Sequence, residues 1–160
     1  MLFRILAEEI AKPQLLDLLL KNKTKLEVFG EWEEFSPNDK LKGLMEEIKQ
    51  KTKDFTGRKL TLLFGYDGQR EMLAAQESLR VSGEIVTEEK LRKNLWTGEL
   101  PDVDLVIRTG GEPHWSAGFM MWQTANSQFY FTEDLWPDFK VEQLKRALED
   151  FKHRERRLGK

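Results

Sequence analysis

The 160-residue sequence contains no cysteine. This absence excludes a disulfide framework, thiolate metal sites and a cysteine nucleophile. No apolar run approaches the roughly 20 residues that a membrane-spanning helix needs. The stretch Met1-Leu2-Phe3-Arg4 is too short, and charged too soon, to begin a signal peptide. We therefore expect a cytoplasmic protein.

The sequence also lacks an excess of one charge. It carries 26 Lys and Arg residues against 28 Asp and Glu residues, a formal net charge of −2. This balance argues against a general nucleic-acid binder, although the stretch from Lys152 to Lys160 is locally basic and suits an anionic ligand. A chain of roughly 150 residues buries about two thirds of its unfolded surface, so we expect one domain over residues 1–160 with its own core.

Hydrophobic spacing and turn residues predict an alternation of helices and strands. Pro13 either kinks a helix over residues 2–22 or starts a second one. The run Asp104–Ile107 is typical of a strand covered on both faces in a parallel sheet. Further helices are predicted from Ser36 onward and over 69–80, 87–95, 119–126 and 141–156, and further strands over 25–29, 59–64 and 128–132. The fold class is therefore α/β, with a largely parallel β-sheet flanked by helices.

Two loops of unusual composition follow predicted strands, where open α/β sheets bind their ligands. They are Tyr66-Asp67-Gly68 and the loop from Arg108 to Gly118. The second loop is the better candidate, because Gly110 and Gly111 permit positive φ, so that successive N–H groups can converge on an anion. Arg108 adds a guanidinium that can bind phosphate oxygens in a bidentate manner.

Three other side chains of this loop suit the same ligand. Glu112 can hold a hard divalent cation, while His114 and Ser116 can donate hydrogen bonds to phosphate oxygens. Together these groups predict a pocket for a diphosphate and magnesium. The residues alone leave an alternative open, a tight turn with a surface ion pair in which His114 is a half-exposed packing residue.

The candidate loop belongs to a longer set of ordered motifs. They are Gly65–Gly68, Asp102–Glu112, Trp122-Gln123, Tyr130-Phe131-Thr132, Leu135–Phe139 and Glu155–Gly159. This set resembles the cis-prenyltransferases, the undecaprenyl diphosphate synthase family. Gly65–Gly68 is similar to the family's Asn-Tyr-Gly-Gly and Glu155–Gly159 to its closing Arg-x-Gly, so the resemblance covers nearly the whole chain.

The resemblance implies a transferase that adds isopentenyl diphosphate to an allylic diphosphate with cis geometry, uses Mg²⁺ and works as a homodimer or heterodimer. It implies that Arg108 and Ser116 clamp the isopentenyl diphosphate and that Glu112 lies near the metal ion. Arg157 and Gly159 would reach the pocket of the partner subunit. The lipid product implies peripheral association with a membrane.

The sequence departs from the family at three places. The N-terminal segment with an Asp-Gly-Asn loop has no counterpart here, so we expect a shortened domain and assign no catalytic residue. His114 aligns with a family arginine and Gln128 with a metal-linked glutamate, and one extra residue lies between Glu112 and Phe119.

The sequence leaves three hypotheses open. The first is an enzyme completed by further polypeptide, and the second is a non-catalytic subunit of a heteromeric prenyltransferase. The third is a binding module for another phosphate ligand.

Overall fold

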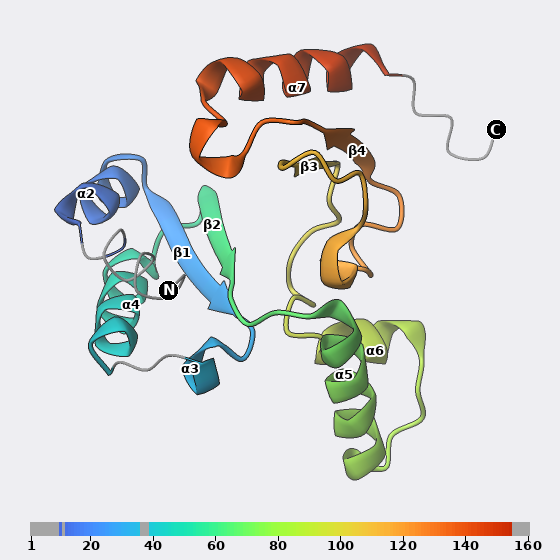
Figure 1. The fold of residues 1–160 in the computed structure, drawn as a ribbon. Coiled ribbons are helices and arrows are strands. Elements are labelled where there is room, and N and C mark those ends of the chain that lie inside the picture. Colours follow the sequence, from blue (N-terminus) through green and yellow to red (C-terminus); the bar gives the residue numbers. More distant parts are fainter. Residues whose placement is uncertain (1–9, 11, 36–38, 155–160) are drawn as a thin grey trace. The chain divides into compact units, whose positions relative to one another are not determined.

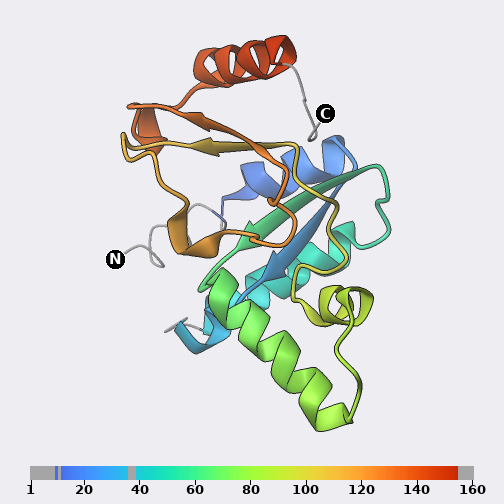
Figure 2. The same cartoon turned by 90° about the vertical axis from the view of Figure 1, so that its right-hand side faces the viewer.

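The computed structural model describes residues 10, 12–35 and 39–154. The chain divides into two compact units, residues 1–66 and 67–160, and each unit is described by itself (Figures 1 and 2). Each unit contains one pair of parallel strands with helices before, between or after them. The α/β class with parallel pairing is therefore confirmed.

The first unit is built on β1 and β2, which pair in parallel from Thr24↔Arg58 to Phe29↔Leu63. Its core consists of buried apolar side chains from β1 and the helices, with Leu26, Met45 and Ile48 at most 1% exposed. The elements are α2 (Pro13–Lys21), β1 (Thr24–Phe29), α3 (Trp32–Phe35), α4 (Asp39–Thr52) and β2 (Arg58–Leu63).

Local signals in the first unit predicted its elements well. Pro13 is the first residue of α2, so of the two alternatives the structure adopts a helix that starts at the proline, where the missing N–H costs nothing. Both predicted strands are confirmed, each beginning one residue earlier than expected. The predicted helix start at Ser36 lies outside the described residues, and α4 is described from Asp39.

The second unit is built on β3 and β4, which pair in parallel from Leu105↔Gln128 to Arg108↔Phe131. Both helices that precede β3 have side-chain caps, because Asp67 accepts from the N–H groups at the start of α5 and Thr87 accepts from Lys90 N in α6. The elements are α5 (Gly68–Ser82), α6 (Glu88–Asn94), β3 (Leu105–Arg108), the 3₁₀ turn η1 (Ser116–Gly118), β4 (Gln128–Phe131), η2 (Trp136–Asp138) and α7 (Val141–His153).

The helix predicted over residues 119–126 is wrong. This segment consists of turns, with one helical hydrogen bond from Thr124 N to Met120 O. Ala117 and Met120 have φ values of 48° and 46°, and this left-handed conformation ends any regular helix. Of the apolar residues that suggested a helix, Met120 is buried, at 8% exposed, whereas Phe119 is 37% exposed.

The predicted burial of β3 on both faces is not observed, because all four of its residues are only half-buried. Trp32 is buried, but Trp136 is 75% exposed. Among the described helices, none combines the length and apolarity that crossing a membrane requires.

Candidate anion-binding site

The loop after β3 is held by its glycine backbone. Gly110 and Gly111 have φ values of 97° and 74°, as predicted. The Gly110 N–H donates to the Asp134 carbonyl at 2.8 Å and the Gly111 N–H donates to the Thr132 carbonyl at 3.0 Å. The expectation that these two N–H groups converge on an anion is therefore wrong, because the segment after β4 already accepts both of them. The glycines shape the loop, and the side chains of the loop are the groups that can bind a ligand.

Three charged or ionisable side chains meet at the carboxyl end of β3. Arg108 Nη2 lies 3.6 Å from Glu112 Oε2 and 3.4 Å from His114 Nε2, and His114 Nδ1 lies 3.6 Å from the same Glu112 oxygen. The loop backbone supports the group, since Arg108 Nε donates to the Glu112 carbonyl at 3.4 Å and His114 N donates to it at 2.8 Å. We call Arg108, Glu112 and His114 the loop cluster.

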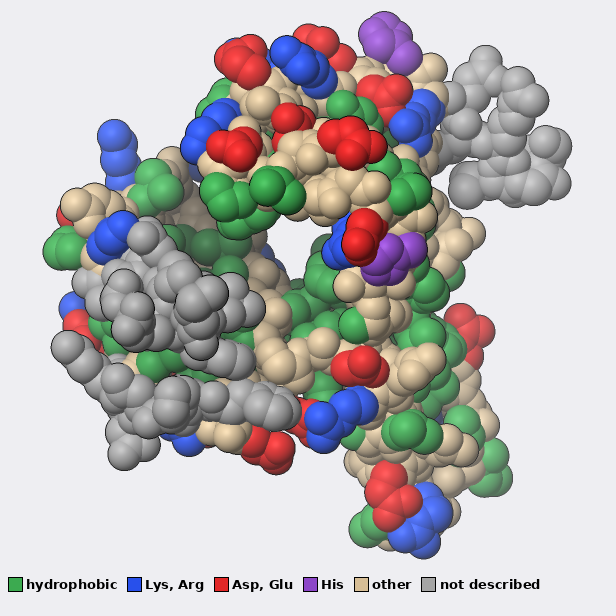
Figure 3. Space-filling model, in the orientation of Figure 1, with side chains coloured by type: hydrophobic (Ala, Val, Ile, Leu, Met, Phe, Trp, Pro, Cys, Tyr) green, Lys and Arg blue, Asp and Glu red, His purple; other side chains and the backbone are tan. Residues whose placement is uncertain are grey.

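The loop cluster is open to ligand. The side chains of Arg108, His114 and Glu112 are 30%, 53% and 69% exposed. Over the face of each unit visible in Figure 3, acidic and basic side chains are interspersed. An anion that binds here is therefore held by these local groups. A guanidinium beside an imidazole can bind two phosphate oxygens, and the carboxylate can face a cation bound to them.

Ser116 lies in the same loop, at the start of η1. Trp115 separates it in sequence from His114, and the Trp115 indole N–H donates to the Phe119 carbonyl at 2.9 Å. No hydrogen bond of the Ser116 hydroxyl is found among the described residues, and the residue is half-buried. Its role in binding stays a prediction.

The start of α5 packs directly on this loop. A Cβ placed on Gly68 would lie 2.0 Å from the Gly118 carbonyl oxygen, so only glycine allows this approach. Asp67 caps the same helix end, where its Oδ1 accepts from Gln69 N at 2.9 Å and Arg70 N at 3.0 Å. The structure thus brings Asp67-Gly68 and the end of the Arg108–Gly118 loop together.

Gln128 lies at the opposite end of the sheet from the loop cluster. It pairs with Leu105 at the amino end of β3, whereas Arg108 is the last residue of that strand. Three residues of parallel strand span about 10 Å. Gln128 therefore cannot join Glu112 of the same chain at a metal ion.

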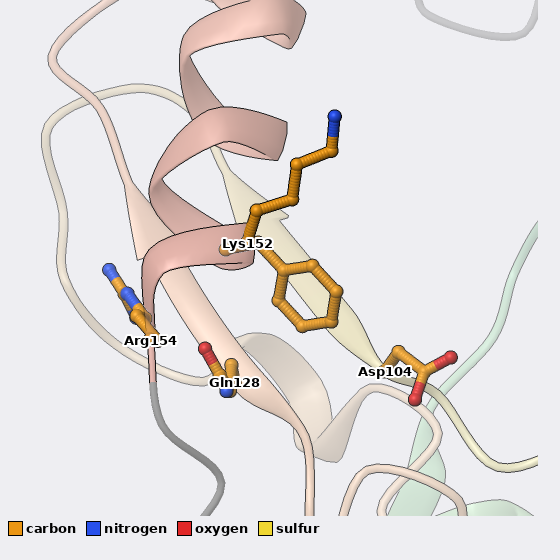
Figure 4. A pocket seen from close by; sticks show the side chains of 5 residues that line it. Asp104, Gln128, Lys152 and Arg154 are labelled. Carbon is orange, nitrogen blue, oxygen red and sulfur yellow. The ribbon is translucent and has the colours of Figure 1, made fainter.

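A pocket of about 370 Å³ surrounds Gln128 at this amino end of the strands. It is lined by Asp104, Gln128, Phe151, Lys152 and Arg154. Figure 4 shows Gln128 and Arg154 on one side of the pocket and Asp104 on the other. The buried Gln128 Oε1 accepts no hydrogen bond within the described residues. This polar pocket is separate from the loop cluster.

The remaining predicted residues are not tested by the described structure. Arg157 and Gly159 lie outside the described residues. Within residues 10, 12–35 and 39–154, no three His, Asp or Glu side chains form a group that could hold a metal ion. Glu112 and His114 are thus at most a partial ligand set.

A buried polar network in the second unit was missed by the sequence reasoning. Glu71 is 1% exposed and accepts from Thr97 N at 2.7 Å and Thr97 Oγ1 at 2.8 Å. Gln123 Nε2 donates to the Thr97 carbonyl at 2.8 Å. The signal was available, because Glu71 shares an i, i+4, i+8 stripe with Ala75 and Leu79, both fully buried. This network ties α5 to the segments on either side of the loop cluster.

Comparison with known proteins identifies relatives across the full length of this chain. A family model described as putative undecaprenyl diphosphate synthase matches residues 1–159. An isoprenyl transferase of Thermotoga maritima is 38% identical over 149 residues, which cover 90% of this chain and 63% of the relative. One of Treponema denticola is 44% identical over 114 residues, covering 70% of this chain and 49% of the relative. The chain thus spans about half to two thirds of these relatives.

Two solved structures show the same fold. A probable undecaprenyl diphosphate synthase from Campylobacter jejuni matches with a TM-score of 0.77 and 28% identity, covering 99% of this chain and 72% of that one. Lavandulyl diphosphate synthase from Lavandula x intermedia, in complex with dimethylallyl diphosphate, matches with a TM-score of 0.87 and 22% identity, covering 99% and 70%.

Proposed function

Because this chain belongs to the undecaprenyl diphosphate synthase family, the cis-prenyltransferases, we propose that its loop cluster binds isopentenyl diphosphate for transfer to an allylic diphosphate. The observation that carries the proposal is the convergence of Arg108, Glu112 and His114 within 3.6 Å of one another at the carboxyl end of β3. Ligands of open α/β folds bind at this end of the strands.

The proposed reaction produces a large change of charge at a diphosphate. As the bond between the allylic carbon and the diphosphate oxygen breaks, the departing group takes the electron pair, and the π electrons of the isopentenyl double bond form the new bond to the allylic carbon. The isopentenyl unit then loses one proton, to the departing diphosphate as base, which restores a double bond. A fixed guanidinium lowers this barrier, because it opposes the developing negative charge without reorganising. Arg108 would hold the other diphosphate, that of isopentenyl diphosphate, which does not leave, and would so orient the double bond toward the allylic carbon. Its hydrogen bond to the Glu112 carbonyl positions it for that contact.

Mg²⁺ is the metal that this chemistry favours, and Glu112 is the residue that would face it. The ion neutralises phosphate charge when bound. Proteins commonly bind Mg²⁺ through one or two carboxylates together with substrate phosphates and water, so one exposed carboxylate fits part of such a set. The side chain of Glu112 is 69% exposed, which leaves its oxygens accessible.

The proposal extends to residues outside the loop cluster. The Ser116 hydroxyl would donate a hydrogen bond to the same diphosphate. Gly110 and Gly111 would contribute to binding only by setting the conformation of the loop. Arg157 and Gly159 would complete the pocket of a partner subunit in a homodimer or heterodimer. A polyprenyl product would bring the assembly to a membrane surface.

A second candidate is a non-catalytic subunit of a heteromeric prenyltransferase. Two observations favour it. The resemblance aligns His114 with a family arginine, and an imidazole carries full charge only when protonated. Gln128 lies at the far end of the sheet from Glu112. Such a subunit would contribute an interface and its C-terminal tail to an active partner.

Chain extension with labelled isopentenyl diphosphate, an allylic primer and Mg²⁺ tests the two candidates. The purified chain is assayed alone and with candidate partner subunits. Extension that requires Arg108 supports the proposed enzyme. Extension that tolerates Arg108→Ala, but falls when residues 157–160 are deleted, supports the non-catalytic subunit. No extension in any combination contradicts both.

A further inference from the structure

The far end of the candidate loop, around η1, has a backbone conformation that few side chains tolerate. Ala117, Gly118 and Met120 have φ values of 48°, 57° and 46°, all in the left-handed region. For residues other than glycine this conformation is unfavourable, so it persists only where surrounding contacts hold it. The contacts of η1 therefore show what fixes this part of the loop.

Hydrogen bonds within the loop set the shape of η1. The Trp115 indole N–H donates to the Phe119 carbonyl at 2.9 Å, and the Phe119 N–H donates to the Ser116 carbonyl at 2.9 Å. Both bonds join residues at most four positions apart. They consequently hold the turn together but do not fix where the turn lies in the second unit.

The first turn of α5 fixes the position of η1. A Cβ on Gly68 would lie 2.0 Å from the Gly118 carbonyl oxygen and 3.4 Å from the Ala117 oxygen, so two backbones meet here with no side chain between them. The same turn of α5 carries the buried Glu71, which accepts from Thr97 N at 2.7 Å and from Thr97 Oγ1 at 2.8 Å. The backbone on which η1 rests is thus itself anchored.

We propose that Gly68 is a positioning residue, whose missing side chain lets α5 hold η1 where the Ser116 hydroxyl reaches the diphosphate. Ser116 is the first residue of η1 and is half-buried. Gly68→Ala would have to move the Gly118 oxygen from 2.0 Å to at least 3.0 Å from the new Cβ. A displacement of about 1 Å can reduce the activity of a site by roughly 100-fold. This role of Gly68 rests on the proposed function, because the ligand is the same isopentenyl diphosphate.

Isothermal titration calorimetry with isopentenyl diphosphate and Mg²⁺ tests this role through a double-mutant cycle. Ser116→Ala and Gly68→Ala should each raise Kd by about tenfold, because each removes the contact of the hydroxyl with the diphosphate. The double variant should bind within about twofold of the weaker single variant, since one contact cannot be lost twice. Gly43→Ala is the matched control, because a Cβ at Gly43 meets nothing within 4 Å, and its Kd should equal that of wild type.

Two results of the cycle would overturn the role of Gly68. One is a Gly68→Ala variant that binds as tightly as wild type. The other is a double variant whose loss of affinity is the product of the two single losses, because Gly68 would then not act through Ser116. A wild-type chain that binds no isopentenyl diphosphate would instead contradict the proposed function, and the role of Gly68 with it.

NMR without ligand separates a displaced turn from a disturbed fold. The Trp115 indole N–H reports on η1, and the Thr97 amide reports on the packing of α5. Gly68→Ala should shift the indole resonance and leave the Thr97 amide protected from exchange. An unmoved indole resonance would overturn the role of Gly68. If Thr97 also loses protection, Trp115→Phe replaces Gly68→Ala in the cycle, because it frees η1 from the Phe119 carbonyl while α5 keeps its glycine, and additivity with Ser116→Ala would then overturn the positioning of Ser116 by η1.

Discussion

Replacing Arg108 by alanine removes the one guanidinium of the loop cluster. A hydrogen bond to a charged group contributes about 1.5–3 kcal/mol, which corresponds to about 10–150-fold in Kd. The contact with Glu112, 3.6 Å long and partly exposed, offsets little of this gain, because such pairs contribute at most about 1 kcal/mol. We expect Arg108→Ala to weaken binding of isopentenyl diphosphate by about 10–100-fold.

Isothermal titration calorimetry with isopentenyl diphosphate and Mg²⁺ measures this effect. Arg108→Lys is the graded variant, because it keeps the charge but loses the bidentate fork, and its affinity should fall between wild type and Arg108→Ala. Arg80→Ala is the matched control, since Arg80 is 71% exposed and its ion pair among the described residues is a local one, with Glu77 at 2.7 Å. An Arg108→Ala affinity within about twofold of wild type would refute the reasoning.

Three further outcomes follow from the structure. His114→Arg adds a permanent charge beside Arg108, so calorimetry should show isopentenyl diphosphate bound more tightly, by up to about tenfold at pH 8. Equal or weaker binding would argue against His114 facing the diphosphate. Glu71→Ala leaves the buried Thr97 N–H and hydroxyl without their acceptor, so urea unfolding should show a loss of about 3 kcal/mol, and a loss below about 0.5 kcal/mol would contradict the network. Partial burial acts to raise the pKa of Glu27, but Lys25 and Lys59 outweigh it and hold that pKa below 4.5. This pairing stabilises the fold at neutral pH and is lost as the pH falls through the lowered pKa, so Lys59→Met should move the NMR titration midpoint of Glu27 upward, and an unchanged midpoint would be evidence against the pairing.

The elements that sequence predicted correctly are those with local signals. Pro13 marks the start of α2 and Thr87 caps α6, and both residues act on atoms within a few positions of themselves. The turn over residues 119–126 has no such signal. Its course depends on left-handed φ values at Ala117 and Met120, which are residue types that rarely adopt them.

The candidate site likewise has a part that local sequence predicts and a part that depends on residues distant in sequence. The sequence predicted that one site would contain Arg108, Glu112 and His114. These residues lie within seven positions of one another, so the loop itself brings them into contact. The use of the Gly110 N–H could not be predicted, because its acceptor, the Asp134 carbonyl, is distant in sequence and is brought near only by the pairing of β3 with β4.

Buried polar partners show the same limit. Glu71 and Thr97 are 26 positions apart, and only the packing of α5 against later segments brings them together. The helical stripe alone indicates that Glu71 is buried, but it does not identify the donor.

The most direct test of the central claim observes the Arg108 guanidinium itself. In a two-dimensional ¹⁵N NMR titration with isopentenyl diphosphate, the assigned Arg108 Nε–Hε resonance should shift in a saturable manner, with the same Kd as calorimetry gives, while the Arg80 Nε–Hε resonance stays fixed. If the donor saturates the protein and the Arg108 resonance does not move, the loop after β3 is not where the diphosphate binds.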